Sequence, residues 1–148
     1  HQYKIDVRIA RIFNTYGPRL SSDDGRVIPN FINQIINEKP IRIYGSGIQT
    51  RSFCYISDMV IALNALMESD YEKPINLGSD KEISINELAK LISNKLEKPL
   101  RIEKHRKLSG DPMFRRPCIE RAKKELKWKP KVTLLEGLDI LINENFHK

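Results

Sequence analysis

The chain has 148 residues, a length that suits one domain or a large part of one. Its 40% hydrophobic residues are enough for a packed core, and no apolar run is long enough to cross a bilayer. The net charge of +7 allows an anionic partner, but the basic residues are dispersed and no aromatic-basic module occurs, which argues against nucleic acid.

Strands and helices are predicted to alternate from the beginning of the chain. Residues 7–13 alternate in polarity and are rich in branched side chains, which predicts a strand that ends before Gly17 and Pro18. A polar loop over residues 21–25 follows. Pro29 opens a predicted helix, because proline is tolerated in a first turn and apolar residues then recur at helical spacing.

The middle of the chain predicts two more strands and a helix. Residues 41–44 predict a short strand, residues 45–47 a tight turn, and residues 52–56 a second strand. Ser57 is the predicted N-cap of the next helix. Asp58 is interpreted as a charge that favours the start of this helix rather than as a ligand.

The later part of the chain continues the alternation. Residues 75–77 and 100–102 predict short strands, and residues 119–126 predict a short basic helix. Residues 84–87 and 133–136 each place a Ser or Thr three positions before a Glu, the spacing of a capping box at a helix start. This alternation indicates an α/β fold, in which the short late strands form a small lobe beside a larger sheet.

Cysteine and histidine positions give no sign of a metal site. Cys54 and Cys118 lie far apart and are expected to be free thiols in a reducing compartment. His1, His105 and His147 occur singly in polar sequence. A zinc site needs three or four ligands held close together, so none is predicted.

Three loops combine arginine with glycine, and they cover residues 14–26, 44–51 and 110–117. The arginine fork matches a phosphate or carboxylate in a two-point geometry, and a neighbouring glycine lets the backbone approach an anion. Because each loop joins regular elements, the three could display these groups around a small anionic molecule. The alternatives are solvent-facing loops and a basic, solvated surface.

The same loops resemble the extended short-chain dehydrogenases, the NAD-dependent epimerase/dehydratase group. Residues 10–27, 44–58, 76–78 and 127–138 keep the order of that family's motifs. Within the family, the Arg26 loop and residues 111–117 are most similar to UDP-glucuronate decarboxylases. The resemblance implies that residues 1–148 form the C-terminal, mainly sugar-nucleotide-binding part: the last Rossmann strands plus a small α/β substrate-binding lobe.

The resemblance also implies roles for individual residues. Arg51 would bind the diphosphate of a UDP-sugar, and Arg115 would reach the substrate from the other side. Thr15 and Arg26 would lie near the nicotinamide end of NAD, which is bound mainly by an N-terminal half that this chain does not include. The substrate-binding set implied by the family is Asn14, Asn30, Phe31, Tyr44, Gly45, Gln49, Arg51 and Arg115.

Several of these residues have structural alternatives. Asn14 could be a turn residue that caps a strand, and Phe31 could be ordinary core. Trp128 is expected to anchor the core rather than to stack on a ligand, and Arg116 to be a surface charge. Cys118 stands where the family usually has an aspartate, which puts the capping of the following helix in doubt more than ligand binding.

No catalytic residue of the family is expected in this chain. Residues 45–47 lack the third glycine of a dinucleotide-binding loop at the required spacing. None of the five tyrosines has a lysine four residues later, so the Tyr-x-x-x-Lys acid-base pair is missing. The chain alone is therefore predicted to be inactive, although the enzymes that it resembles convert UDP-glucuronate to UDP-xylose and carbon dioxide through a 4-keto intermediate.

Other functions remain open at this point. A related UDP-sugar 4-epimerase or nucleotide-sugar 4,6-dehydratase would share the same motifs, and a basic polyanion-binding module would represent a different class. The resemblance implies a homodimer for the whole protein, with no nucleic acid and no membrane contact from this segment. The expected compartment is the cytoplasm, or the Golgi lumen if a preceding segment carries an anchor.

Overall fold

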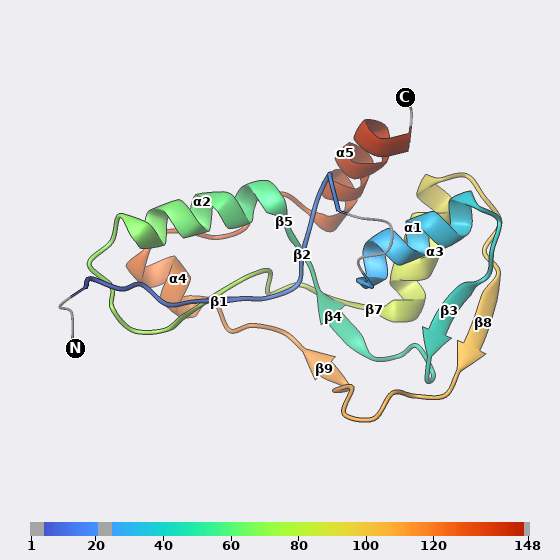
Figure 1. The fold of residues 1–148 in the computed structure, drawn as a ribbon, viewed down its shortest axis with the longest axis horizontal. Coiled ribbons are helices and arrows are strands. Elements are labelled where there is room, and N and C mark those ends of the chain that lie inside the picture. Colours follow the sequence, from blue (N-terminus) through green and yellow to red (C-terminus); the bar gives the residue numbers. More distant parts are fainter. Residues whose placement is uncertain (1–4, 21–24, 147–148) are drawn as a thin grey trace.

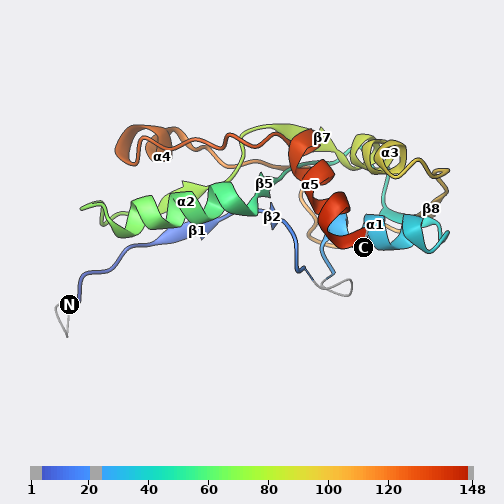
Figure 2. The ribbon, with the colours of Figure 1, turned by 90° about the horizontal axis from the view of Figure 1, so that it is seen from above.

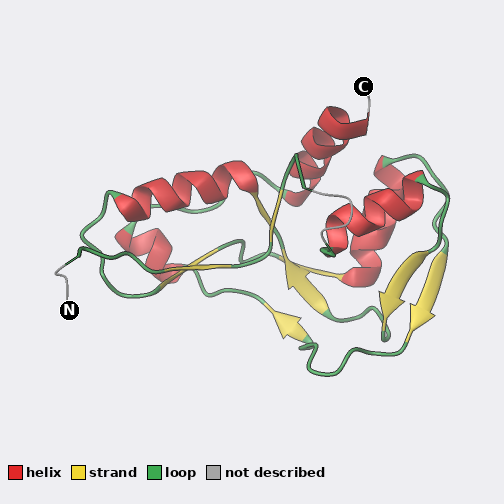
Figure 3. Ribbon diagram, viewed as in Figure 1, coloured by secondary structure: helices red, strands yellow, loops and turns green. Residues whose placement is uncertain are grey.

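The structure is a computed structural model that describes residues 5–20 and 25–146. The polar loop predicted over residues 21–25 and the predictions on His1 and His147 fall largely or wholly outside these ranges. Figure 1 shows an elongated α/β molecule with a group of elements at each end, and the perpendicular view of Figure 2 shows the same two groups. Short parallel and antiparallel strand pairs, coloured yellow in Figure 3, lie within and between them.

The first group is built on one parallel pair of strands. β1 (Ala10–Ile12) pairs with β6 (Ile75–Leu77), and the helices α2 (Ile56–Met67) and α4 (Glu120–Glu125) complete the group. Its buried residues, called the Trp128 core, are Cys54, Met59, Ala62, Leu66, Ile75, Leu77, Ile119, Ala122 and Trp128. Trp128 is 5% exposed, which confirms the prediction that it anchors the core.

The second group surrounds a larger core with helices and strands. Its elements are α1 (Val27–Ile36), β3 (Ile41–Tyr44), α3 (Ile85–Lys95), β8 (Ile102–His105) and α5 (Leu134–Phe146). Its buried residues, called the Phe31 core, are Tyr16, Ile28, Phe31, Ile32, Ile35, Ile41, Ile43, Phe53, Tyr55, Ile85, Leu88, Ala89, Ile92, Leu138, Leu141 and Ile142. Phe31 therefore has the core position that the sequence left open.

Short strands connect the two groups. β2 (Thr15–Tyr16) pairs in parallel with β5 (Cys54–Tyr55), so the chain after β1 lies beside the chain before α2. β4 (Thr50–Ser52) lies between β7 (Glu82–Ser84), which is antiparallel to it, and β9 (Phe114–Arg115), which is parallel. β4 therefore brings one segment from the later half of the chain to each of its edges.

Two of the three helix starts predicted from N-cap residues are confirmed, and one is wrong. The capping box at α3 is present, with Glu87 N–H donating to Ser84 Oγ and Ser84 N–H donating to Glu87 Oε2. The same pattern joins Thr133 to Glu136 before α5. The prediction for Ser57 was wrong, because α2 begins at Ile56 with Tyr55 as an extended N-cap and no side-chain hydrogen bond.

Strand lengths differ from the sequence predictions because a strand needs a partner. The segment predicted over residues 7–13 forms a strand only over Ala10–Ile12, where β6 offers residues Ile75–Leu77. The strand predicted over residues 52–56 divides into β4 and β5, and the strand predicted over residues 100–102 lies at Ile102–His105, opposite β3. Alternating polarity alone does not report where the neighbouring strand ends.

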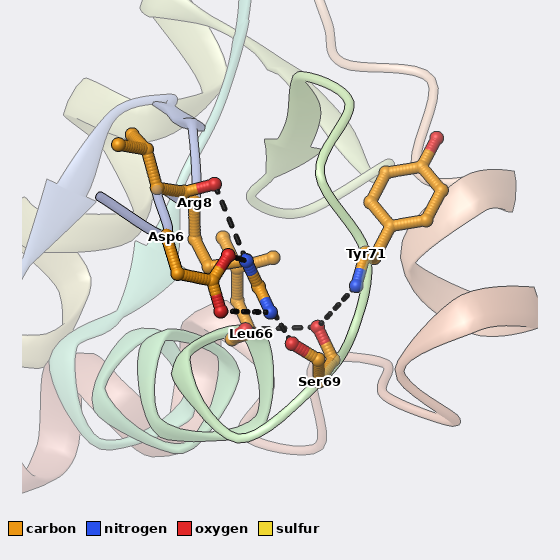
Figure 4. A network of polar contacts seen from close by, with 6 residues as sticks. Asp6, Arg8, Leu66, Ser69 and Tyr71 are labelled. Atoms are coloured by element: carbon orange, nitrogen blue, oxygen red, sulfur yellow. Dashed lines mark hydrogen bonds and ion pairs between the residues drawn. The ribbon is translucent and has the colours of Figure 1, made fainter. Parts of the chain in front are cut away.

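Polar contacts hold the segment before β1 against the end of α2. Figure 4 shows Arg8 between Asp6 and Ser69: Arg8 Nε donates to Ser69 O at 2.5 Å, and a second guanidinium nitrogen pairs with Asp6. Ser69 Oγ in turn donates to Leu66 O at 2.8 Å and accepts Tyr71 N–H at 3.3 Å. These bonds position the segments that lead into β1 and β6, at one end of this parallel pair.

Candidate functional site

A cavity of about 320 Å³ opens beside the Phe31 core. This volume lies at the lower end of the range typical of small-molecule sites, roughly 300–1,000 Å³. Its walls come from the chain after β1, the start of α1, β3, the loop that follows β3, β4 and the loop before β9. Among its lining residues are Asn14, Thr15, Arg26, Asn30, Phe31, Tyr44, Gln49 and Arg51.

One end of the cavity is formed where β2 meets the start of α1. Asn14 O accepts Cys54 N–H at 2.9 Å, which fixes the backbone of Asn14 against β5. The Thr15 hydroxyl donates to Phe13 O at 2.9 Å, and Arg26 Nη1 lies 3.4 Å from Thr15 O. The two residues for which the family implies cofactor contact therefore touch each other at this end.

The loop after β3 is held rigidly against α3. Gly45 and Gly47 both have φ of +78°, a left-handed conformation that favours glycine. A Cβ on Gly47 would lie 2.1 Å from Asn86 Oδ1, and Asn86 N–H donates to Gly47 O at 2.9 Å. Gln49 Nε2 closes the loop by donating to Tyr44 O at 2.7 Å, so its side chain supports the cavity wall.

Arg51 is the buried cation of the site. The residue is only 8% exposed, and its Nη1 donates to Thr50 O at 2.6 Å. Its Nη2 forms an ion pair with Asp111, which also lines the cavity. A buried guanidinium with one carboxylate partner keeps further N–H donors for an anion, because the group has five.

Gly45 and Arg115 are not among the residues that line the cavity. Arg115 is the register partner of Arg51 in the parallel β4–β9 pair, so both side chains leave the same face of that sheet. Arg115 is nevertheless exposed, whereas Arg51 is buried. The structure therefore brings the two arginines into neighbouring positions but not into one cavity, and a role for Arg115 in substrate binding stays a prediction.

Arg42, Leu108 and Asp111 also line the cavity, and none of them belongs to the set of site residues that the family resemblance implies. A usable signal existed for Arg42, because it stands two positions before Tyr44 and a strand of period two displays both on one face. Asp111 had been noted only as part of a motif. Its pairing with Arg51 joins positions 60 residues apart, which no local pattern reports.

Asp58, expected from the sequence to be a charge at a helix start, is a buried hydrogen-bond acceptor. Asp58 is 2% exposed, and its Oδ2 accepts the N–H groups of Lys131 and Val132, both at 2.8 Å. Asp58 O also accepts Trp128 Nε1–H at 3.0 Å. Asp58 is thus more than a charge at a helix start, because it fixes the connection that leads to α5.

The cysteines are both free. Burial, reinforced by the nearby Asp58 charge, raises the pKa of Cys54 to about 12. Cys118 is exposed, and α4 has Ile119 as its N-cap and no side-chain cap, so residue 118 lies one position before the cap. Within residues 5–20 and 25–146, no group of three or more potential metal ligands occurs, and no helix is long and apolar enough to cross a membrane.

Comparison with known proteins places this architecture in one family. The profile of the NAD dependent epimerase/dehydratase family matches residues 1–78. UDP-glucuronic acid decarboxylase 1 of Arabidopsis thaliana is 47% identical over 140 residues, which is 95% of this chain and 32% of that protein. The chain thus spans about a third of the length of this curated relative.

Solved structures share the fold. Epimerase Mth375 from Methanothermobacter thermautotrophicus superposes with a TM-score of 0.90 at 29% identity, over 98% of this chain and 45% of that one. UDP-glucuronic acid 4-epimerase from Bacillus cereus, in complex with UDP-glucuronic acid and NAD, gives 0.87 at 28% identity over 95% and 45%. The described fold corresponds to part of these larger Rossmann-type proteins, and the chain belongs to the NAD dependent epimerase/dehydratase family.

Proposed function

We propose that this chain is the sugar-nucleotide-binding part of an NAD-dependent UDP-glucuronate decarboxylase. The complete enzyme would convert UDP-glucuronate to UDP-xylose and carbon dioxide through a 4-keto sugar. The observation that carries the proposal is the cavity in which Arg51, Asn14, Tyr44 and Gln49 meet. The 47% identity to a plant UDP-glucuronic acid decarboxylase supports this choice of substrate and reaction.

In the proposed site, the nucleoside lies at one end of the cavity and the sugar at the other. Arg51 would bind the diphosphate with charge-assisted hydrogen bonds, which gain strength where water is excluded. Tyr44 and Gln49, on and beside the rigid loop after β3, would surround the nucleoside. Asn14 would lie beside the diphosphate, so the sugar would extend toward the end formed by Thr15 and Arg26.

The residues at that end fit a cofactor contact. Thr15 and Arg26 lie in contact at the rim, where polar groups can meet the nicotinamide end of NAD. When bound, NAD would supply the reversible hydride acceptor for C4 of the sugar, and Thr15 and Arg26 would hold its nicotinamide end. This chain's own contribution would be to hold C4 in place, because no Tyr-x-x-x-Lys pair occurs in its sequence.

Substitution of Arg51 tests the binding site. In the full-length protein that contains this chain, Arg51→Ala should weaken UDP-glucuronate binding roughly 10- to 150-fold, because a bond to a charged group contributes about 1.5–3 kcal/mol. Isothermal titration with UDP and the Michaelis constant both report this change. Arg101→Ala is the matched control, since Arg101 is exposed and does not line the cavity.

Unchanged affinity in Arg51→Ala, with the variant folded, would refute the assignment. Arg115→Ala tests whether Arg115 binds the substrate. A loss of affinity comparable to that of Arg51→Ala would mean that the segment around β9 moves onto the substrate. A loss no larger than that of Arg101→Ala would leave Arg115 as a surface charge of β9.

Product analysis separates decarboxylation from the reactions of related enzymes. A 4-epimerase is the second candidate, supported by the superposition on UDP-glucuronic acid 4-epimerase from Bacillus cereus. Incubation of the full-length protein with UDP-glucuronate and NAD should release carbon dioxide and UDP-xylose. Formation of the C4 epimer, without carbon dioxide, would favour the epimerase, and turnover of dTDP-glucose would favour a 4,6-dehydratase.

Two further parts of the proposal concern the chain by itself and its assembly. The 148 residues alone should bind UDP but form no UDP-xylose, and detectable product would contradict this. The full-length protein should be a homodimer, which light scattering would test. Salt-dependent binding of random RNA without binding of UDP would instead support a polyanion-binding module.

A further inference from the structure

Gly137 lies in the first turn of α5, where nothing in the helix itself requires a glycine. Its N–H donates to Thr133 O at 3.0 Å, which is the ordinary bond of an α-helix. Its φ does not lie in the left-handed region that favours glycine. Glycine also destabilises a helix relative to alanine. The physical reason for this glycine therefore lies outside α5.

The space above Gly137 is occupied by two tyrosine rings. A Cβ on Gly137 would lie far inside contact distance of Tyr16 Oη, 2.8 Å from Tyr16 Cζ and 2.9 Å from Tyr55 Cδ2. Unstrained carbon contacts are about 3.5–4.0 Å long. Figures 1 and 2 show α5 beside β2 and β5, the strands that carry these tyrosines. The glycine thus permits a close approach of α5 to β2.

Tyr16 is enclosed on the sides that α5 does not cover. The residue is 2% exposed, and its ring meets the edges of the Phe53 and Tyr55 rings, with centroids 6.4 Å and 5.5 Å away. Its hydroxyl donates to Leu134 O, at the start of α5, at 3.3 Å. Since protein interiors are close-packed, a group added at position 137 has to displace this ring and, with it, the backbone of β2.

β2 forms one end of the cavity. Tyr16 directly follows Thr15, and both residues line the cavity. Thr15 O lies 3.4 Å from Arg26 Nη1, so a shift of β2 changes the contact between these two residues. None of the described residues of α5 lines the cavity. An effect of α5 on this end of the cavity is therefore indirect.

We propose that Gly137 and Tyr16 are positioning residues: the close approach of α5 sets the place of β2, and thereby of Thr15 and Arg26 at the cofactor end of the cavity. This inference rests on the proposed function, because it takes Thr15 and Arg26 to meet NAD. The diphosphate end is independent of this contact, because Arg51 belongs to β4. The contact between Gly137 and Tyr16 thus tunes cofactor binding and turnover, but not UDP binding.

Separate titrations of the full-length protein with NAD and with UDP test this division. Gly137→Ala should weaken NAD binding about three- to tenfold, the change expected when one hydrogen bond is lost, and leave UDP binding within about twofold. The kcat for UDP-glucuronate should fall further, by roughly tenfold to a hundredfold, because misplaced groups slow the chemical step.

A second substitution tests whether the effect passes through Tyr16. Tyr16→Phe removes the oxygen that makes the tightest contact with the added methyl group. NAD binding by the double variant Gly137→Ala/Tyr16→Phe should therefore return close to that of Tyr16→Phe alone, so that the two substitutions are not additive. Asn143→Ala is the matched control, because Asn143 is exposed on α5 and alanine is again the better helix former. It should change neither NAD binding nor kcat.

The outcomes separate this inference from the function on which it rests. Equal losses for NAD and UDP, or a loss that persists in the double variant, would overturn the inference, since Gly137 would then serve only the packing of α5. If Gly137→Ala fails to fold in a thermal melt, a folded double variant supports the inference, and two unfolded variants overturn it. Unchanged NAD binding and kcat in Gly137→Ala would overturn the inference alone. Failure of the unsubstituted protein to bind UDP and NAD would overturn the proposed function and the inference together.

Discussion

The two ends of this molecule close their cores to different degrees. Around the Phe31 core, helices and strands lie on several sides, and the cavity opens at its surface. Around the Trp128 core, β1 pairs only with β6 among the described residues. Several large apolar side chains of this end are exposed, namely Ile5, Val7, Ile9 and Ile12 before and in β1, and Val60, Ile61 and Met67 on α2.

The half around the Phe31 core contains the cavity, whereas the half around the Trp128 core contains the β1–β6 strand pair. Parallel strands are normally buried on both faces within larger sheets, and contiguous exposed apolar surface marks a place where another element packs. The β1–β6 half resembles one part of a larger sheet, in agreement with the finding that the whole chain covers 45% of the superposed epimerase.

The largest expected effect tests whether the Trp128 core is closed in spite of its exposed side. Cys54 belongs to that core and has a pKa raised to about 12 by burial, whereas Cys118 is exposed. A thiol reagent at pH 8 should therefore modify Cys54 far more slowly than Cys118, because Cys54 is buried and the thiolate is the reactive species.

The variant Cys118→Ser isolates the slow reaction, and denaturant should make it fast. Equal rates for the two thiols in the native protein would contradict a closed Trp128 core, since they would show that this core opens readily. The measurement needs only absorbance against time with a chromogenic disulfide.

The next effect concerns the link between the two halves. Asp58 belongs to α2, yet it binds the N–H groups of Lys131 and Val132 on the way to α5. Asp58→Ala should lower the free energy of unfolding by about 2–4 kcal/mol, because two N–H donors lose a charged acceptor. Urea denaturation measures this loss.

Asp139→Ala provides the matched control. Asp139 pairs with Lys95 at the surface, with its side chain 55% exposed, and such pairs contribute about 0–1 kcal/mol. Similar losses in the two variants would show that Asp58 does not join the halves. Two separate transitions in Asp58→Ala would sharpen the comparison, because they would reveal independent unfolding of each half.

The sequence predicted features that depend on neighbouring residues. The capping boxes before α3 and α5, the α/β alternation and the glycine-rich turn after β3 all follow from spacings of a few residues. Eight of the ten site residues implied by motifs that resemble the family also line the cavity, all except Gly45 and Arg115. Such motifs carry tertiary information that periodicity does not.

Features that depend on distant contacts were not predictable. Asp58 receives its bonds from positions 73 and 74 residues away, and the length of β1 is limited by β6. Arg42 has no motif of its own and becomes informative only when the cavity is seen beside it. Arg115 is the opposite case: its motif predicted a substrate contact, but Arg115 lies on β9 and does not line the cavity.

The smallest expected effect compares a helix that begins with a capping box and helices that begin without one. α3 begins with the Ser84–Glu87 capping box, whereas α1 in the same half and α2 and α4 in the other have no side-chain cap. Ser84→Ala should therefore lower the free energy of unfolding by about 1 kcal/mol at pH 7. Replacing Ser57 by Ala, at the position wrongly predicted as a cap, should have a smaller effect, because α2 begins at Ile56.

The pH dependence of Ser84→Ala identifies its cause. Hydrogen bonds from the Ser84 hydroxyl and backbone N–H hold the pKa of Glu87 below its usual 4.5. A carboxyl group with a lowered pKa stabilises the fold above its unfolded pKa and loses this contribution as the pH falls through its folded pKa. The difference between Ser84→Ala and the unsubstituted protein should therefore shrink toward pH 3, leaving the part due to Glu87 N–H donating to Ser84 Oγ. A difference that is constant from pH 7 to pH 3 would mean that the carboxylate takes no part in starting α3.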